Sequence, residues 1–509
     1  MYPPAIARER PGHLAYVMAG SGDSLTYAAL DDRSTRFSQA LRAAGVTTGE
    51  TLLIAMENRI EWPIAVAAGM RSGLYVTPVN SHLREHELAA LVAEAHPAAV
   101  ITSPALAPVV AAALSETAQR PRLMLCVGAG AEEFERFDDV LEAAPAVPIA
   151  DETFGARVLY SGGSTGRPRA FRQRLLEVHP SEAPIRHGGL MSMLGLDGDS
   201  VFLSPAPAYH AAPFTFQLAA LTAGATVICM ERFDARGAMA TILRHGVTLS
   251  QWVPTMLVRL LDAHAEAERS GETLPLSPRH RAAVTSGGPC APEIKAAIDA
   301  WWGPILHEYY GASEGYGHTY ISPLEARERV GSVGRALGET RVHIVDEAGR
   351  EVPTGEIGTV AFEALGARTY ANQGESAGWR HMGDLGTMDA DGFVYLKGRA
   401  GYTIVSGGVN VYPDEVEHAV ASHPWVRDVA VLGEPDPEFG ERVLAVVELH
   451  ESAPTDDAGT VEAAIIAHTR ERVATFKAPK RVLIVDRLPR LPTGKLNKKA
   501  LRDELVAQR

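Results

Sequence analysis

The chain has 509 residues, of which 46% are hydrophobic and 22% are charged, a balance typical of globular proteins with large buried cores. This length predicts two to four domains. The net charge of -14 argues against nucleic acid as a partner, because an acidic surface repels a polyanion.

The sequence predicts neither a targeting segment nor an integral membrane segment. The N-terminus lacks the apolar core of a signal peptide, and two hydroxyl residues and two prolines interrupt the most apolar stretch, residues 98–114. We interpret that stretch as a buried strand followed by a helix. The cysteines (Cys126, Cys229 and Cys290) have no spacing for a zinc site or a disulfide framework, which favours a reducing cytoplasm.

In chain order, the first predicted element of interest is a strand at the apolar run Val158–Tyr160, which a glycine-rich loop follows. Residues 226–311 then alternate between β-like and helical patterns. The predicted elements are Thr226–Met230, a helix over Ala235–His245, Val247–Val253, a helix from Pro254 to about Arg269, Ala282–Thr285 and a helix over Glu293–Trp302 that Pro292 opens. Such alternation predicts a parallel sheet with crossover helices, and ligands gather at the C-terminal ends of its strands. We therefore expect the loops after Tyr160, Thr285 and Tyr310 to line one crevice.

The pattern changes after about Arg335. The next predicted strands are short and separated by turns, at Arg341–Val345, Gly358–Phe362 and Gly392–Lys397. From Tyr412 a smaller α+β pattern begins, with a helix entered at Pro413, β runs at Val426–Leu432 and Arg442–Leu449, and a helix near Val461–Val473. A domain boundary is expected near Gly398–Gly401.

The loop between Tyr160 and Ala170 reads YSGGSTGRPRA and has two chemical interpretations. Its glycines and hydroxyls could wrap around phosphate oxygens, with Arg169 adding charge. Alternatively, Gly162-x-Ser164-x-Gly166 matches a hydrolase nucleophile elbow. An elbow serine must be followed at once by a helix, and Pro168 opposes one here. A surface turn without a ligand is the simplest alternative.

Three further motifs are weak when taken alone. Glu314, next to Ser313 at a predicted strand end, could hold a magnesium ion, although Ser-Glu is also an ordinary helix start. Asp384 follows a glycine and could bind ribose hydroxyls with Arg399 nearby, but it could also be a turn residue. Lys495 supplies a mobile charge on a loop, as any surface lysine would.

The order and spacing of these motifs resemble the adenylate-forming superfamily of acyl-CoA synthetases, luciferases and peptide-synthetase adenylation domains. The similar segments are the phosphate loop Tyr160–Ala170, the acidic motif Tyr310–Glu314, Asp384, Gly398-Arg399, Ser406–Glu417 and the lysine loop Pro492–Lys495. The resemblance spans the chain from Leu25 to Leu501. It implies an α/β fold with a large N-terminal domain of parallel αβα-layered sheets plus a β-rich subdomain (1–398), a hinge (399–401) and a small mobile α+β C-terminal domain (402–509).

The resemblance also implies a role for each matching residue. ATP and AMP would be bound by Ser161, Gly163, Ser164, Thr165, Gly166, Arg169, Gly287, Gly288, Pro289, Glu308, Tyr309, Tyr310, Gly311, Ser313, Asp384, Arg399 and Lys495. Glu314 would hold Mg²⁺, Gly401 would be the hinge, and Gly407, Gly408 and Lys477 would contact coenzyme A. The catalytic residues would be Lys495, Glu314 and His210.

The implied reaction is ATP-dependent formation of an acyl-adenylate, followed by transfer of the acyl group to a thiol. The basic tail, residues 470–509 with 12 Lys and Arg against 4 Asp and Glu, would suit the coenzyme A nucleotide, although a solvated helix face explains it equally simply. The loop departs from the family pattern, because Ser161-Gly162 replaces Thr-Ser and Arg169-Ala170 replaces Lys-Gly. Arginine keeps the charge and can grip phosphate with two donors.

The segment Tyr209–Phe216 carries no acid that could bind a substrate amine, so a plain hydrophobic carboxylic acid is expected. Phe214 and Phe216 with the small residues beside them suggest an apolar pocket, and His210 is expected near the bound carboxylate. One alternative is an adenylating enzyme that passes its acyl group to a carrier protein or another nucleophile. A second is a degenerate, non-catalytic nucleotide or acyl binder. A homodimer is retained as a candidate assembly.

Overall fold

The computed structural model forms two compact units. It describes residues 2–83, 85–117, 120–162, 168–172, 174–183, 188–288, 290–311, 315–363, 379–399, 402, 404–406, 409–436, 440–454, 457–473, 475, 477–491 and 496–507. The first unit holds the described residues up to Trp252 and Arg259–Val284. The second unit holds Val253–Val258 and the described residues from Thr285 onward.

Two sheets form the first unit. One has six parallel strands in the order β7 (Glu135–Arg136), β6 (Leu123–Cys126), β5 (Pro97–Thr102), β3 (Thr51–Ala55), β4 (Tyr75–Pro78), β8 (Ala156–Arg157). The other has the order β14 (Ala282–Thr285), β13 (Leu249–Trp252), β11 (Val201–Ser204), β12 (Thr226–Cys229), β1 (Leu14–Met18), β2 (Ser24–Thr26), with β2 antiparallel to β1. The parallel sheets predicted from the alternating pattern are confirmed.

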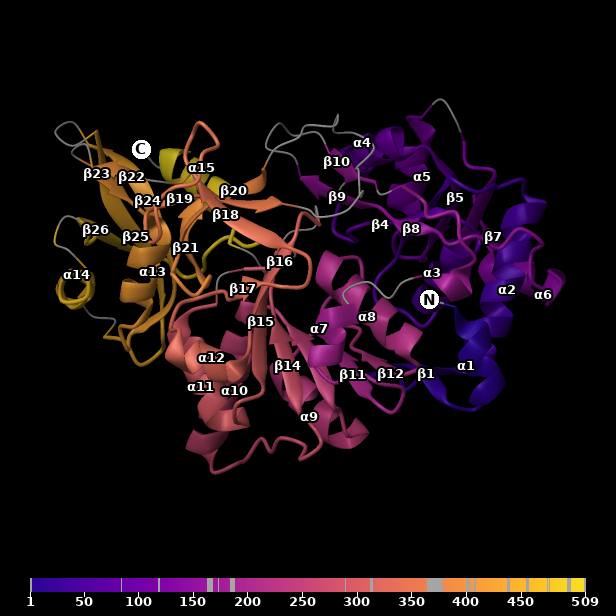
Figure 1. Cartoon of the computed structure of the whole chain (residues 1–509), viewed down its shortest axis with the longest axis horizontal. Coiled ribbons are helices and arrows are strands. Elements are labelled where there is room, and N and C mark those ends of the chain that lie inside the picture. Colours follow the sequence, from indigo (N-terminus) through magenta and orange to yellow (C-terminus); the bar gives the residue numbers. More distant parts are fainter. Residues whose placement is uncertain are drawn as a thin grey trace. The chain divides into compact units, whose positions relative to one another are not determined.

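Helices α3 (Trp62–Arg71) and α8 (Ala211–Ala223) lie between these two sheets (Figure 1). Gly69 allows α3 to approach its sheet closely, because a Cβ there would lie 2.5 Å from Val76 Cγ2. Trp62 on α3 meets Phe214 on α8 with ring centroids 6.0 Å apart. The other helices of this unit are α1 (Pro3–Glu9), α2 (Tyr27–Ala43), α4 (Glu85–Ala95), α5 (Ala107–Ser115), α6 (Phe137–Ala143), α7 (Gly188–Met193), α9 (Ala235–His245) and, from Arg259 onward, α10 (Pro254–Ser270), with a 3₁₀ turn at Pro180–Glu182.

The strand predicted before the glycine-rich loop, Val158–Tyr160, begins at the parallel sheet, where the Val158 amide donates to the Val76 carbonyl oxygen of β4 at 2.9 Å, and then leaves that sheet. Strand β9 (Leu159–Gly162) pairs antiparallel with β10 (Pro168–Phe171), so that Ser161 stands opposite Arg169. The loop therefore follows a strand of a separate two-stranded sheet, which continues from β8 of the parallel sheet. A nucleophile elbow joins a strand to a helix, whereas here a second strand begins at Pro168, so the elbow interpretation of Ser164 is wrong.

The second unit contains β15 (Leu306–Gly311), β16 (His318–Ile321) and β17 (Arg335–Ala336), which are antiparallel neighbours, with helices α11 (Pro292–Trp302) and α12 (Pro323–Glu328). The β-rich subdomain is confirmed as an antiparallel sheet in the order β18 (Arg341–Val345), β19 (Gly358–Glu363), β20 (Arg380–Met388), β21 (Val394–Arg399).

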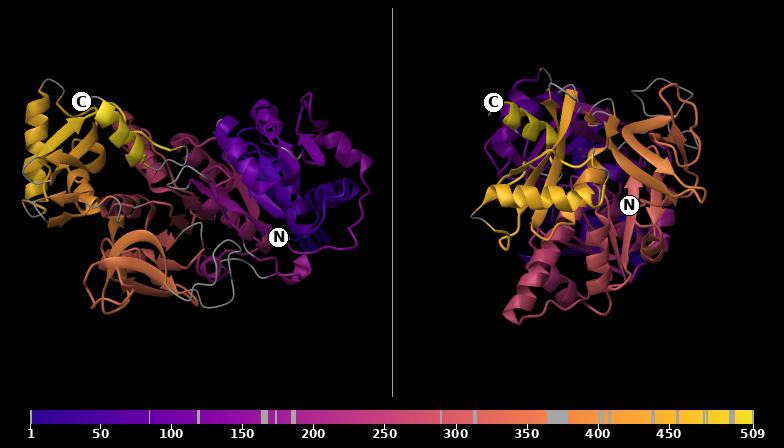
Figure 2. Two further views of the ribbon diagram at one scale, coloured as in Figure 1. Left: turned by 90° about the horizontal axis from the view of Figure 1, so that it is seen from above. Right: turned by 90° about the vertical axis from the view of Figure 1, so that its left-hand side faces the viewer.

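A separate C-terminal α+β domain, also expected, completes the second unit (Figure 2). Its strands are β23 (Val409–Val411), β22 (Ile404–Ser406), β25 (Gly440–Leu449) and β24 (Val426–Asp436), with β26 (Arg481–Ile484) parallel to β25. Its helices are α13 (Pro413–Ala421), α14 (Ala458–Arg470) and α15 (Lys498–Ala507).

Alternation along these strands gives the C-terminal sheet two apolar faces. One face, including Val431 and Val443, packs with residues of α13 and α14. The other, including Leu432 and Leu444, packs with Leu501 of α15. Across the part of the chain that the structure describes, no helix combines the length and apolar composition needed to cross a membrane. The limits 1–398, 399–401 and 402–509 stay a prediction.

Candidate functional site

The end of β15 brings together two residues that were predicted to bind a nucleotide. The Tyr310 hydroxyl donates a hydrogen bond of 2.7 Å to Oδ2 of Asp384 on β20, and that aspartate is 9% exposed. Gly311 is required beside them, because a Cβ there would lie 2.6 Å from the ring of His318 on the paired strand. Each carboxylate oxygen can accept more than one hydrogen bond, so a carboxylate oriented in this way can also accept from a ligand hydroxyl.

The register of β20 and β21 places Asp384 directly opposite Arg399. These two residues were predicted to lie close together, and their backbones are neighbours on paired strands. The side chain of Arg399 is outside the described part of the structure. Gly398, just before it, has φ of +117° and a Cβ there would lie 3.4 Å from Asp414 Oδ1, so a glycine suits this position.

Glu308 lies on β15 with Tyr309 and Tyr310, but its carboxylate faces a protein partner. Lys295 Nζ on α11 lies 2.7 Å from Glu308 Oε2, and both side chains are nearly buried. Burial raises the pKa of the Glu308 carboxyl, and the Lys295 ammonium opposes that rise. A buried charge is stable only when it is paired, so this contact fixes β15 against α11.

The turn after β14 carries two buried hydroxyls that sequence reasoning missed. Thr285 and Ser286 are 0% and 4% exposed, and within the described residues neither side-chain oxygen has a hydrogen-bond partner. The turn continues through Gly287, whose φ is +87°, and Gly288, where a Cβ would come no closer than 4.0 Å to Pro254. Buried hydroxyls that lack a protein partner fit a wall that faces a polar ligand.

His210 occupies the N-cap position of α8, and its ring lies 4.3 Å from that of Tyr209, edge to face. Arg157 on β8 holds this helix end, because its Nη1 donates to the Ala211 carbonyl oxygen at 2.9 Å and to the Thr215 hydroxyl. The Arg157 guanidinium also lies over the Phe214 ring, 5.9 Å from its centroid. Strand β8 therefore holds the N-terminal end of α8, where His210 lies.

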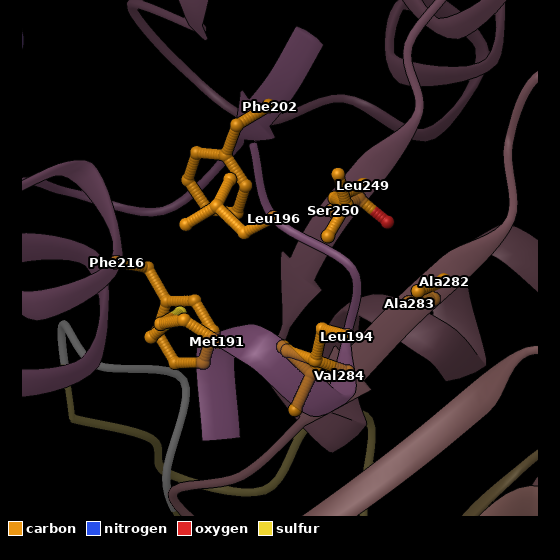
Figure 3. Close-up of a pocket in the computed structure, with 10 residues that line it drawn as sticks. All are labelled: Met191, Leu194, Leu196, Phe202, Phe216, Leu249, Ser250, Ala282, Ala283 and Val284. Atoms are coloured by element: carbon orange, nitrogen blue, oxygen red, sulfur yellow. The ribbon is translucent and has the colours of Figure 1, made fainter. Parts of the chain in front are cut away.

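Close to this helix lies a small apolar pocket of the first unit (Figure 3). Its free volume is about 10 Å³, enough for roughly one water molecule. It is lined by Met191, Leu194, Leu196, Phe202, Phe216, Leu249, Ser250, Ala282, Ala283 and Val284. An acyl chain would enter only if flexible lining residues such as Met191 move aside.

Ser250 is the only residue with a polar side chain in that lining, and its hydroxyl oxygen points away from Phe216 and Met191 (Figure 3). It lies 2.8 Å from His280 Nε2 and accepts a hydrogen bond of 2.6 Å from Trp252 Nε1. Burial lowers the pKa of His280 to about 4. The imidazole is therefore neutral at pH 7, and the pocket wall is uncharged.

The expectation that Phe214 and Phe216 share one pocket is half wrong. Phe216 lines the pocket, whereas Phe214 packs against Trp62 on another side of α8. Residues two positions apart on a helix point about 200° apart, so they cannot both face one cavity.

Lys477, predicted to contact coenzyme A, forms an ion pair within its own domain. Its Nζ lies 2.7 Å and 2.8 Å from the two carboxylate oxygens of Glu415 on α13. Other cations of the basic tail are paired as well: Arg481 with Glu434, Arg490 with Asp428, and Lys498 with Glu417. The structure thus accounts for much of the tail's charge without a polyanion.

Several predicted site residues lie outside the described part of the structure. They are Gly163, Ser164, Thr165, Gly166, Pro289, Ser313, Glu314, Gly401, Gly407, Gly408 and Lys495. The backbones of Ser161 and Arg169 are described, but their side chains are not. Within the described ranges, no three His, Cys, Asp or Glu side chains gather as metal ligands do. The roles of Glu314 as the Mg²⁺ ligand and of Lys495 as a catalytic residue stay predictions.

Two family models match this chain: AMP-binding enzyme over residues 4–365, and AMP-binding enzyme C-terminal domain over residues 415–495. The sulfoacetate–CoA ligase of Cupriavidus necator is 30% identical over 491 residues, covering 94% of this chain and 92% of that protein. A medium/long-chain-fatty-acid–CoA ligase of Mycobacterium tuberculosis is 32% identical over 517 residues, covering 94% and 86%. The structure of the o-succinylbenzoate CoA synthetase of Bacillus subtilis with its acyl-adenylate intermediate superposes with a TM-score of 0.78 at 25% identity, covering 98% and 97%.

Proposed function

Because this chain belongs to the AMP-binding enzyme family, we propose that it is an AMP-forming acyl-CoA synthetase acting on a hydrophobic carboxylic acid. It is a ligase that consumes ATP and coenzyme A. The observation that carries the proposal is the hydrogen-bonded pair of Tyr310 and Asp384 beside Gly311, in a chain that the family models match in both of its domains.

The reaction has two steps. In the first, a carboxylate oxygen of the acid attacks the α-phosphorus of ATP, the bond to the bridging oxygen breaks, and pyrophosphate leaves with the electron pair. In the second, the thiol of coenzyme A loses its proton, its sulfur attacks the acyl carbon, and AMP leaves. Both steps gather negative charge on oxygen, so positioned donors and cations supply most of the acceleration.

Different residues of this chain bind different parts of ATP. Asp384 accepts hydrogen bonds from the ribose hydroxyls, because Tyr310 already orients its other oxygen. Ser164, Thr165, Gly166 and Arg169 hold the β- and γ-phosphates. Lys495 neutralises charge at the α-phosphate during the first step.

Mg²⁺ is the expected cofactor, held by Glu314, and when bound it supplies positive charge beside the phosphates. Ser313 contacts the α-phosphate next to it. Gly407, Gly408 and Lys477 border the path of coenzyme A. For Lys477 this requires the nucleotide to compete with Glu415.

The apolar pocket between α8 and the strands β11, β13 and β14 supports a hydrophobic acyl group, with His210 at the helix end near the carboxylate. The names of the relatives leave the acid open, because one acts on sulfoacetate and another on medium and long fatty acids. The three buried free cysteines suit a reducing cytoplasm, and a homodimer stays a prediction.

ATP–pyrophosphate exchange with a panel of fatty, aromatic and steroid acids tests the proposal. Exchange that depends on one class of acid, followed by thioester formation with free coenzyme A, is the expected result. Exchange without thioester formation would favour transfer to a carrier protein or another nucleophile. No exchange with any acid would favour a non-catalytic binder.

A further inference from the structure

The segment Pro492–Lys495 lies outside the described residues, but both of its flanks are described. Arg490 and Leu496 form an antiparallel β-bridge, and the Asn497 amide donates to the Pro489 carbonyl oxygen at 2.8 Å. Consecutive Cα atoms are about 3.8 Å apart, so whatever fixes Leu496 also limits where Lys495 can be.

Charged pairs hold these flanks to the rest of the domain. Arg490 forms an ion pair with Asp428 on β24. Lys498, the first residue of α15, has its Nζ 2.6 Å from Glu417 Oε1 on α13, and the two side chains are 14% and 15% exposed. The same carboxylate oxygen accepts the Val431 amide at 2.7 Å, which ties α13 to the sheet.

A ring next to the predicted hinge provides a second contact for α15. Lys498 Nζ lies 5.9 Å from the centroid of the Tyr402 ring, and the Arg502 guanidinium carbon lies 5.7 Å from it. The two cations are four residues apart and therefore share one face of the helix. Tyr402 directly follows the segment 399–401, so residues just after that segment contact the helix that follows the lysine loop.

The sequence has three lysines here, at positions 495, 498 and 499. The structure assigns two of them to protein partners: Lys498 to buried Glu417, and Lys499 to exposed Asp503 at 2.8 Å. Glu417 therefore neutralises a cation three residues from Lys495. A buried ion of this kind loses much of its stabilisation when its partner is removed.

We propose that Glu417 is a positioning residue for adenylate formation, acting through Lys498 to place the loop that carries Lys495. The inference rests on the proposed function, because it assigns Glu417 to the first of the two half-reactions. Tyr402 assists by holding the same end of α15. The second half-reaction does not need Lys495 in place, so it does not need Glu417.

Glu417→Gln tests the proposal, because it removes the charge and leaves an oxygen for the Val431 amide. We expect kcat of acid-dependent pyrophosphate exchange to fall about 10- to 100-fold, as a misplaced catalytic group does. Thioester formation from supplied acyl-adenylate and coenzyme A is expected to stay within about twofold of the wild type. An equal loss in both half-reactions, or no loss in either, would overturn the proposal.

Lys498→Gln and Lys499→Gln form a matched pair, because both remove one lysine charge from the first turn of α15. Only Lys498→Gln should lower adenylate formation selectively. Should Glu417→Gln fail to fold, Tyr402→Leu takes its place, with an expected selective loss of about threefold because each exposed cation–π contact is weak. A wild type that shows no exchange with any acid would refute the proposed function itself, whereas an active wild type with an unaffected Glu417→Gln would refute only this inference.

Discussion

The apolar pocket of the first unit and the lysine-loop region of the C-terminal domain are stabilised in different ways. The pocket has aliphatic and aromatic walls, and the polar cluster behind it, Ser250, Trp252 and His280, is neutral at pH 7. The lysine loop is flanked by ion pairs, Arg490 with Asp428 and Lys498 with Glu417. The pocket therefore depends on shape and packing, and the described flanks of residues 492–495 depend on charge.

Lys495→Ala should have the largest effect. Adenylate formation is expected to fall about 10²- to 10³-fold, because a cation that stabilises the transition state is lost. Thioester formation from supplied acyl-adenylate should not change. Single-turnover measurements of each half-reaction check this, and parallel losses would contradict a division of labour between the two regions.

Acidification should destabilise the first unit through His280. Its pKa is about 4 in the folded protein against 6.5 for an ordinary histidine, so its stabilising contribution is complete above pH 6.5 and is lost as the pH falls toward 4. Over this pH range the free energy of unfolding should fall by about 3 kcal/mol. Urea unfolding at several pH values, followed by tryptophan fluorescence, measures it.

His280→Gln is the control for this pH dependence. It keeps a side chain that can hydrogen-bond to Ser250 and removes the titrating group. The variant should lose less stability than the wild type between pH 6.5 and 4. Identical slopes for both proteins would show that other groups cause the acid sensitivity.

Asp384→Asn should raise KM for ATP about 10- to 100-fold, because hydrogen bonds to a charged group are worth about 1.5–3 kcal/mol. Tyr310→Phe removes only the donor that orients the carboxylate and should raise KM about fivefold. Steady-state kinetics with varied ATP checks both. A larger effect for Tyr310→Phe would assign Tyr310 a direct role and Asp384 a supporting one.

Phe216→Leu should shift the preference about tenfold toward bulkier acids, because Phe216 lines the pocket. Phe214→Leu is its matched control, since Phe214 packs on Trp62 instead. Ratios of kcat/KM across the acid panel measure the shift. Equal shifts in both variants would mean that α8 moves as a whole.

Sequence alone predicted much of the fold. The helix over Ala235–His245 and the strand Ala282–Thr285 have the bounds expected from their patterns, because strong periodicity and flanking turn residues defined them. The pair Tyr310 and Asp384 could be expected to meet only through the family resemblance, since 74 residues separate them.

Other features depend on tertiary contacts that no local pattern encodes. The local sequence around Lys295 is that of any helical lysine, and only the folded structure shows that it pairs with Glu308. Helix α8 is largely apolar and is buried on several sides, so its composition does not distinguish the face of Phe214 from that of Phe216. Strand β9 has the apolar pattern of a sheet strand, yet its only partner among the described strands is β10.

The β9–β10 pair has a consequence for comparing family members. Both departures from the usual phosphate-loop pattern, Ser161-Gly162 and Arg169-Ala170, lie on this hairpin, and Ser161 faces Arg169 across it. The two departures therefore share one cross-strand position, at which the backbones of Ser161 and Arg169 are directly opposite. Neither strand of the hairpin pairs with another described strand, so its register depends on the two strands alone, and chimeras that exchange hairpin strands between relatives test this dependence. Such chimeras should keep their fold only when both strands are exchanged together.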